Sequence, residues 1–98
     1  MYDMDHLLTL LMVEKAKELR FRVGSPPIIL SEDEERPLQG PPVLGEDVMQ
    51  LFRSLATSRQ IRDLRKCGTV EFVYTTRGRS PFLVRARMEN NNVVFHVS

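Results

Sequence analysis

The sequence predicts an α+β domain in which three helices cover one face of an antiparallel sheet. Three features of the sequence lead to this prediction. Apolar residues recur at helical spacing in three stretches. In other stretches they alternate with charged residues, which is typical of half-buried strands. Residues that favour tight turns join the last strands, which indicates an antiparallel meander. The chain has 98 residues, and we expect residues 1–98 to form a single domain.

The first helix is predicted over residues 4–17. Asp3 or Asp5 can cap its start and suits the positive end of the helix dipole. The apolar side chains that form its buried stripe are Met4, Leu7, Leu8, Leu11 and Met12.

The spacing of apolar residues then changes from 3.6 residues, as in a helix, to two residues, as in a strand. Residues 18–23 alternate, with Phe21 predicted to face the core and Arg20 and Arg22 to face outward. The prolines in residues 24–27 must end this strand, because proline lacks the amide hydrogen that a ladder needs. Residues 28–30 form a second short strand, residues 31–35 an acidic turn, and residues 36–38 an edge strand.

Two further helices are predicted in the middle of the chain. Residues 46–56 place four apolar side chains on one face, and two acidic residues stand in the first turn. Thr57 and Gln60 have the spacing of a capping box, which starts a helix that runs to residue 66 and buries Ile61 and Leu64. Gly68 stands where a left-handed residue ends such a helix.

The last third of the chain is predicted to be a three-stranded meander. Residues 70–75 and 82–88 form its first two strands, joined by a turn at residues 77–80. Three asparagines at residues 90–92 turn the chain again, because asparagine tolerates positive φ. Residues 93–97 close the sheet.

The formal net charge is +1, but the charges are unevenly placed. Residues 1–52 contain five Lys/Arg and ten Asp/Glu, whereas residues 53–87 contain nine Lys/Arg and two Asp/Glu. If the two parts separate in space, the molecule has an acidic and a basic region. The alternative is that arginines on the strands only keep one sheet face in water.

The sequence contains none of the residue patterns that carry catalysis. Neither His6 nor His96 has neighbours at metal-ligand spacing, and there is no glycine-rich phosphate loop. We therefore expect no enzyme activity, no cofactor and no metal. Cys67 is the single cysteine, and no apolar stretch approaches the ~20 residues of a membrane span. A cytoplasmic location, without membrane insertion, is expected.

Arginines form the most suggestive pattern. They occur in pairs two residues apart, and on a strand such pairs point to one face and can bind carboxylates or phosphates. The predicted interaction surface comprises these arginines and an acidic complement: Arg20, Arg22, Arg77, Arg79, Arg85, Arg87, Glu34 and Glu35. Nucleic-acid binding is less favoured, because Phe21, Phe72 and Phe82 are predicted to face the core rather than the arginines.

Several short motifs occur in the order of a known family. Residues 17–28 resemble an S-D-L-H-L-x-x-G-x-P-P stretch, and residues 55–68 resemble a helical segment that ends in glycine. Residues 69–72, 81–87 and 93–96 resemble strands of D-F-S-F, R-F-R-V-N-A-F and A-V-F-R type. This arrangement resembles the N-terminal domain of the type IV pilus retraction ATPases (PilT-type), members of the type II/IV secretion ATPase superfamily.

The resemblance implies a PAS-like fold of two layers, with three helices packed on the sheet. The motor domain of that family is not represented in these 98 residues. Pro81, Leu83 and His96 stand where the family carries arginines that help to sense nucleotide held by the motor. The chain is either one domain of a longer ATPase-like protein or a small protein that reuses the domain.

The resemblance thus implies a non-catalytic interaction or oligomerisation domain of pilus (twitching motility) or secretion machinery. Its partner would be a second copy or an ATPase motor domain. A PAS-like ligand sensor is the alternative, with Tyr74 and Thr75 as its candidate polar groups, and a basic nucleic-acid-binding module is the less favoured one.

Overall fold

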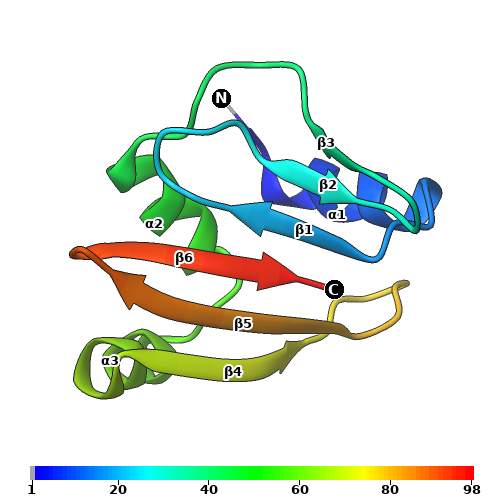
Figure 1. Ribbon diagram of the computed structural model, residues 1–98. Helices are drawn as coiled ribbons and strands as arrows, with labels where there is room; N and C mark the ends of the chain where they lie inside the picture. Colours follow the sequence, from blue (N-terminus) through cyan, green and yellow to red (C-terminus); the bar gives the residue numbers. More distant parts are fainter. Residues whose placement is uncertain (1) are drawn as a thin grey trace.

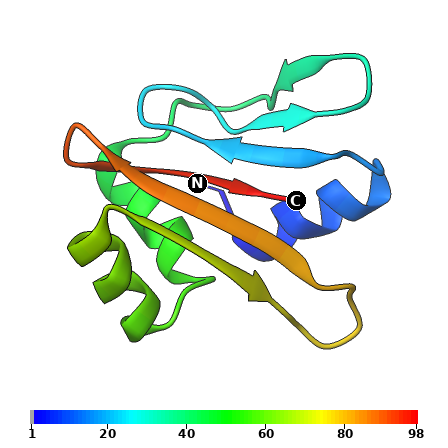
Figure 2. The same cartoon turned by 60° about the horizontal axis from the view of Figure 1, so that its bottom comes forward.

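The computed structural model describes residues 2–98 and has two layers, with three helices on one side of a six-stranded sheet (Figures 1 and 2). Neighbouring strands are all antiparallel, in the order β3-β2-β1-β6-β5-β4. The α+β prediction is therefore confirmed. In chain order the elements are α1 (Met4–Val13), β1 (Glu18–Phe21), β2 (Ile28–Leu30), β3 (Glu35–Pro37), α2 (Gly45–Arg53), α3 (Ser58–Cys67), β4 (Thr69–Tyr74), β5 (Phe82–Glu89) and β6 (Asn92–Val97).

The last strand lies in the middle of the sheet. β6 pairs with β5 as the predicted meander requires, and it also pairs with β1, where His96 lies opposite Arg20. His96 also lies opposite Arg85 on β5. β3 is an edge strand, as its proline predicted, and β4 forms the other edge. The two ends of the sequence thus meet in one continuous sheet.

The core lies between the sheet and the helices. Phe21 and Phe95 are fully buried and stack with ring centroids 4.4 Å apart and ring planes 11° apart. Phe52 of α2 packs on Phe95 with ring centroids 5.4 Å apart. The predicted inward orientation of Phe21 is confirmed, and these three rings join the centre of the sheet to α2.

Helix α1 is shorter than predicted. It ends at Val13 instead of residue 17, because Lys15 adopts a left-handed conformation with φ 53°. The Lys17 amide then donates a hydrogen bond of 2.8 Å to the Leu30 carbonyl, which draws the chain into the sheet. Helix α2 likewise ends at Arg53, three residues early, and the Ser54 hydroxyl donates to the Leu51 carbonyl.

Strand β1 also ends earlier than predicted, at Phe21 instead of residue 23. Beyond it the backbone leaves the sheet and pairs with the loop before α2. The Gly24 amide donates to the Val43 carbonyl at 2.8 Å, and the Val43 amide donates to the Ser25 carbonyl at 3.0 Å. These bonds place the start of α2 beside the sheet.

The predicted caps and turns are confirmed. Thr57 and Gln60 form a reciprocal capping box at the start of α3, and Gly68 ends it with φ 84°. In the β5–β6 turn Asn90 and Asn91 both have positive φ, of 52° and 67°. Within residues 2–98, no helix is long and apolar enough to cross a membrane.

Candidate interaction surface

The sheet face opposite the helices is uncovered and carries most of the predicted arginines. Because Phe21 points into the core, its neighbour Arg20 points to the uncovered face. The strand register places the side chains opposite Arg20 on this same face. We call it the open face, and its charged residues are Glu18, Arg20, Arg22, Glu35, Glu71, Arg85, Arg87, Glu89 and His96.

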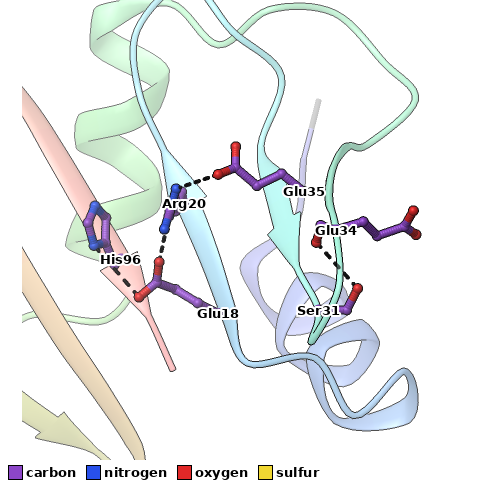
Figure 3. A network of polar contacts seen from close by, with 6 residues as sticks. All are labelled: Glu18, Arg20, Ser31, Glu34, Glu35 and His96. Carbon is purple, nitrogen blue, oxygen red and sulfur yellow. Dashed lines mark hydrogen bonds and ion pairs between the residues drawn. The ribbon is translucent and has the colours of Figure 1, made fainter.

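Arg20 is the centre of one charge network on the open face (Figure 3). Its Nε lies 2.6 Å from Glu18 Oε2, and its Nη1 lies 3.1 Å from Glu35 Oε2. The hydrogen bond to Glu18 is the main cause of the raised pKa of Arg20. One guanidinium thus joins β1 to the edge strand β3, and Glu35 is already paired with an arginine of the same chain.

The remaining arginines of the open face also have carboxylate partners. Glu89 Oε2 lies 3.1 Å from Arg87 Nη2 and 3.7 Å from Arg22 Nη2. Arg85 Nε lies 2.9 Å from Glu71 Oε2 on β4. Four arginines therefore face four glutamates, so the open face is close to charge balance rather than basic.

His96 lies between these networks. Its Nδ1 is 3.8 Å from Glu18 Oε1. Burial is the main cause of its lowered pKa; Glu18 acts in the opposite direction, and Arg20, Arg87 and Arg22 lower the pKa further. The imidazole is therefore neutral at pH 7, and its carboxylate neighbour remains available to Arg20.

The open face contains a hollow of about 430 Å³ with an apolar floor. Val94 lies in it and is only 5% exposed, although it is on the uncovered side of the sheet and its partner on β5 is Arg87. Long arginine stems cover apolar surface while their charged ends remain in water. The hollow thus combines an apolar floor, Ile28 and Val94, with guanidinium groups at its rim.

The arginines of the β4–β5 turn do not join the open face. Arg79 points to α1, where its Nη1 lies 2.7 Å from Asp5 Oδ1 and its Nη2 lies 2.8 Å from Thr9 Oγ1. Its side chain is 16% exposed, and its hydrogen bond is the main cause of the lowered pKa of Asp5. Arg77 is exposed in the same turn. Arg79 therefore fastens the turn to the first helix.

The two predicted acidic residues also separate. Glu35 faces Arg20, whereas the side chain of Glu34 points away from the sheet (Figure 3). The Glu34 carbonyl accepts a hydrogen bond of 2.9 Å from the Ser31 amide, which closes the turn between β2 and β3.

A second cationic region was not predicted from the sequence. Arg53 of α2 and Arg62 and Arg65 of α3 line a surface groove of about 580 Å³, together with Ser58 and Ile61. Residues 58, 62 and 65 have helical spacing, and this pattern could have identified a single helical face.

Of the two candidate groups of a ligand sensor, Tyr74 lies on the helix side. Tyr74 lines a surface hollow of about 320 Å³ with Tyr2, Asp5 and Gln50. Thr75 is exposed just after β4. Within residues 2–98, no three His, Cys, Asp or Glu side chains gather in a way that could hold a metal ion.

Known proteins resemble this chain in structure rather than in sequence. No protein-family profile matches it, and no curated protein matches it. The crystal structure of the pilus retraction motor PilT with bound ADP superposes with a TM-score of 0.88 at 18% identity, over 99% of this chain and 29% of that one. The ATPase DotB of Legionella pneumophila superposes with a TM-score of 0.74 at 13% identity, over 96% of this chain and 27% of DotB. DotB of Yersinia pseudotuberculosis gives 0.65 at 12% identity, over 96% of this chain and 28% of that one.

The chain therefore has the fold of a domain found in secretion ATPases, and it spans less than a third of the length of each. The particular fold is that of the N-terminal domain of PilT-type ATPases, so the resemblance stated from the sequence motifs is confirmed at the level of the fold.

Proposed function

We propose that this domain is a non-catalytic interaction or oligomerisation module, related to the N-terminal domain of pilus retraction or secretion ATPases, and that it docks on another protein through its open face. The observation that carries the proposal is the hollow around Val94, where an apolar floor is surrounded by arginines on a sheet face that no helix covers.

An uncovered face is not by itself a docking surface, because antiparallel sheets commonly leave one face in water. The composition of this face supports docking. Arginine is enriched at protein interfaces, and an apolar centre with a charged rim is the usual anatomy of an interface. Charge pairs at such a rim contribute specificity and faster association more than affinity. A partner with matching charges could exchange pairs with Arg22 and Arg85, which are 58% and 65% exposed.

The same face gives less support to nucleic-acid binding. A phosphate backbone would have to compete with the four glutamates that already pair with the arginines. Apart from the His96 imidazole, the strand residues that point outward from β1, β5 and β6 are not aromatic, so base stacking would depend on a single ring.

A PAS-like ligand sensor is also less favoured. Such a sensor would bind its ligand between the sheet and the helices. Here the stacked and tilted rings of Phe21, Phe95 and Phe52 fill that space at the centre of the sheet.

The partner that the resemblance suggests is the motor domain of a secretion or pilus ATPase in the cytoplasm. A second copy of this chain is the other expected partner. In this proposal the domain positions proteins within a pilus or secretion machine, with a role in twitching motility where the machine is a pilus, and it performs no chemistry itself.

The test is sedimentation of this chain with the purified motor segment of a pilus retraction ATPase, from 0.01 to 1 M salt. We expect a weak complex that dissociates as the Debye length falls from ~30 to ~3 Å. The double variant Arg22→Glu/Arg85→Glu should lose the complex. The matched control, Lys17→Glu/Arg77→Glu, changes the net charge equally off the open face and should retain it. Binding that is insensitive to the first variant would contradict docking through the open face.

A further inference from the structure

Two groups of like charges without ion-pair partners lie near opposite edges of the sheet. Among residues 2–98, the ion pairs within 4.0 Å include none of the α2–α3 cations Arg53, Arg59, Arg62, Arg65 and Lys66. They also include none of the three acids of the β2–β3 turn, Glu32, Asp33 and Glu34. We propose that the groove between α2 and α3 binds the β2–β3 turn of a second copy, so that copies associate head to tail.

The residues that line the groove favour the binding of an acidic segment. It is lined by the apolar side chains of Ile61 and Ala56 and by three arginines, Arg53 of α2 and Arg62 and Arg65 of α3. All three arginines are exposed. Arginine presents a fork of donors that matches a carboxylate, so three guanidinium groups around one groove favour a ligand with several carboxylates.

Helix α3 as a whole reinforces this preference. It carries Arg59 and Lys66 beside the groove arginines, and Asp63 is its single carboxylate. The side chains of Arg65 and Lys66 stand in the last turn of the helix, where cations suit its dipole. Four cations against one carboxylate give α3 a net positive charge, and among residues 2–98 none of these four cations takes part in an ion pair within 4.0 Å.

The β2–β3 turn has the complementary chemistry. The hydrogen bond from the Ser31 amide to the Glu34 carbonyl closes a tight four-residue turn. Glu32, Asp33 and Glu34 are all exposed on it. The turn thus presents three carboxylates on a narrow projection, while the adjacent Glu35 is held by Arg20 and marks the end of the available segment.

One molecule cannot bring these two regions together. The turn lies beside β3 at one edge of the sheet, and α3 packs beside β4 at the other edge (Figure 1). Five strand spacings separate the edges, about 24 Å at ~4.8 Å each. The two regions can therefore meet only between copies. Such a contact uses different surfaces on the two partners, and repeated it gives a ring or a filament.

This contact deepens the proposed interaction role, but it leaves the open face free. A chain that docks on a motor domain through its open face could still contact its neighbour through α3. Exposed ion pairs contribute little individually, so we expect weak association, on the order of 0.1–1 mM, at low salt.

The test reverses the charge of each surface in turn and measures self-association by sedimentation equilibrium in about 0.01 M salt. One variant is Arg62→Glu/Arg65→Glu and the other is Glu32→Lys/Glu34→Lys, each checked for folding by circular dichroism. Each variant alone places like charges at the contact, so its self-association should weaken by at least about tenfold. In an equimolar mixture each turn meets a groove of opposite charge, and association should return to the level of the unmodified chain.

The matched control is Arg22→Glu/Arg85→Glu, which makes the same change in net charge on the open face. It should self-associate as the unmodified chain does. If this control abolishes self-association, copies meet through the open face and the α3 contact is wrong, although docking through the open face survives. Mixed variants that stay monomeric, or an unmodified chain that stays monomeric at about 1 mM, would also overturn the inference.

Discussion

Replacing Phe21 by alanine tests the packing that holds the two ends of the chain in one sheet. The ring is fully buried, it stacks on Phe95 at 4.4 Å, and Phe95 in turn packs on Phe52 at 5.4 Å. Truncation leaves a cavity between β1, β6 and α2. Changes of this kind cost about 3–5 kcal/mol, of which the loss of an aromatic pair accounts for about 0.5–1.5 kcal/mol.

That cost is large for a domain of this size. A chain of 98 residues has a free energy of unfolding of roughly 5–15 kcal/mol. Phe21→Ala should therefore shift the midpoint of urea unfolding strongly, with an unchanged slope. Arg22→Ala, on the outward side of the same segment, should change the free energy of unfolding by no more than about 0.5 kcal/mol.

Circular dichroism in urea measures both variants. Phe21→Leu provides a milder change, of about 1–2 kcal/mol, in case the alanine variant does not fold. Equal costs at Phe21 and Arg22 would mean that the inward and outward sides of β1 are wrongly assigned, and the open face with them.

Three further predictions concern the turn, the histidine and nucleotide. Arg79→Ala should release the β4–β5 turn from α1 and speed amide hydrogen exchange in residues 75–81. Arg77→Ala should leave this exchange unchanged, because Arg77 is exposed. Equal exchange rates in the two variants would refute the role of Arg79 in holding the turn against α1. Because burial holds the pKa of His96 below its ordinary 6.5, the unfolded chain binds more protons near pH 6. The free energy of unfolding should therefore fall as the pH drops from about 7 to about 5, and His96→Gln should reduce this slope; an unchanged slope would refute it. The purified chain should neither bind nor hydrolyse ATP with magnesium, since it contains no phosphate loop, and turnover that survives repurification would refute this.

The sequence predicted best the features that local chemistry determines. The capping box at Thr57, the left-handed Gly68 and the asparagine turn each follow from a few adjacent residues, and all were confirmed. The end of α1 was predicted too late, because the break at Lys15 has no glycine or proline to mark it. The helix ends in a local motif in which the Ala16 amide donates to the Leu11 carbonyl and the Lys15 amide to the Met12 carbonyl. The bond from Lys17 to Leu30, which local sequence does not reveal, then ties the chain to the sheet.

The candidate site depended even more on distant contacts. Alternation in the sequence predicted that Arg20 and Arg22 face outward, as they do, but only the strand order places β6 between β1 and β5. The pairing of those arginines with glutamates depends on cross-strand register. Arg79 and Asp5 are 74 residues apart in the sequence, so no local pattern indicates their contact. The overall resemblance to the ATPase domain was visible because several weak motifs occur in the same order.

The open face of the sheet is the proposed docking surface. Its most direct test is a nuclear magnetic resonance titration, in which the unlabelled motor segment of a pilus retraction ATPase is added to this chain labelled with ¹⁵N. The largest amide shifts should lie at the outward residues of β1, β5 and β6, around Arg20, Arg85 and His96, and they should vanish in about 1 M salt. Shifts confined to the helices on the other side of the sheet, or none at any concentration of the motor segment, would contradict it.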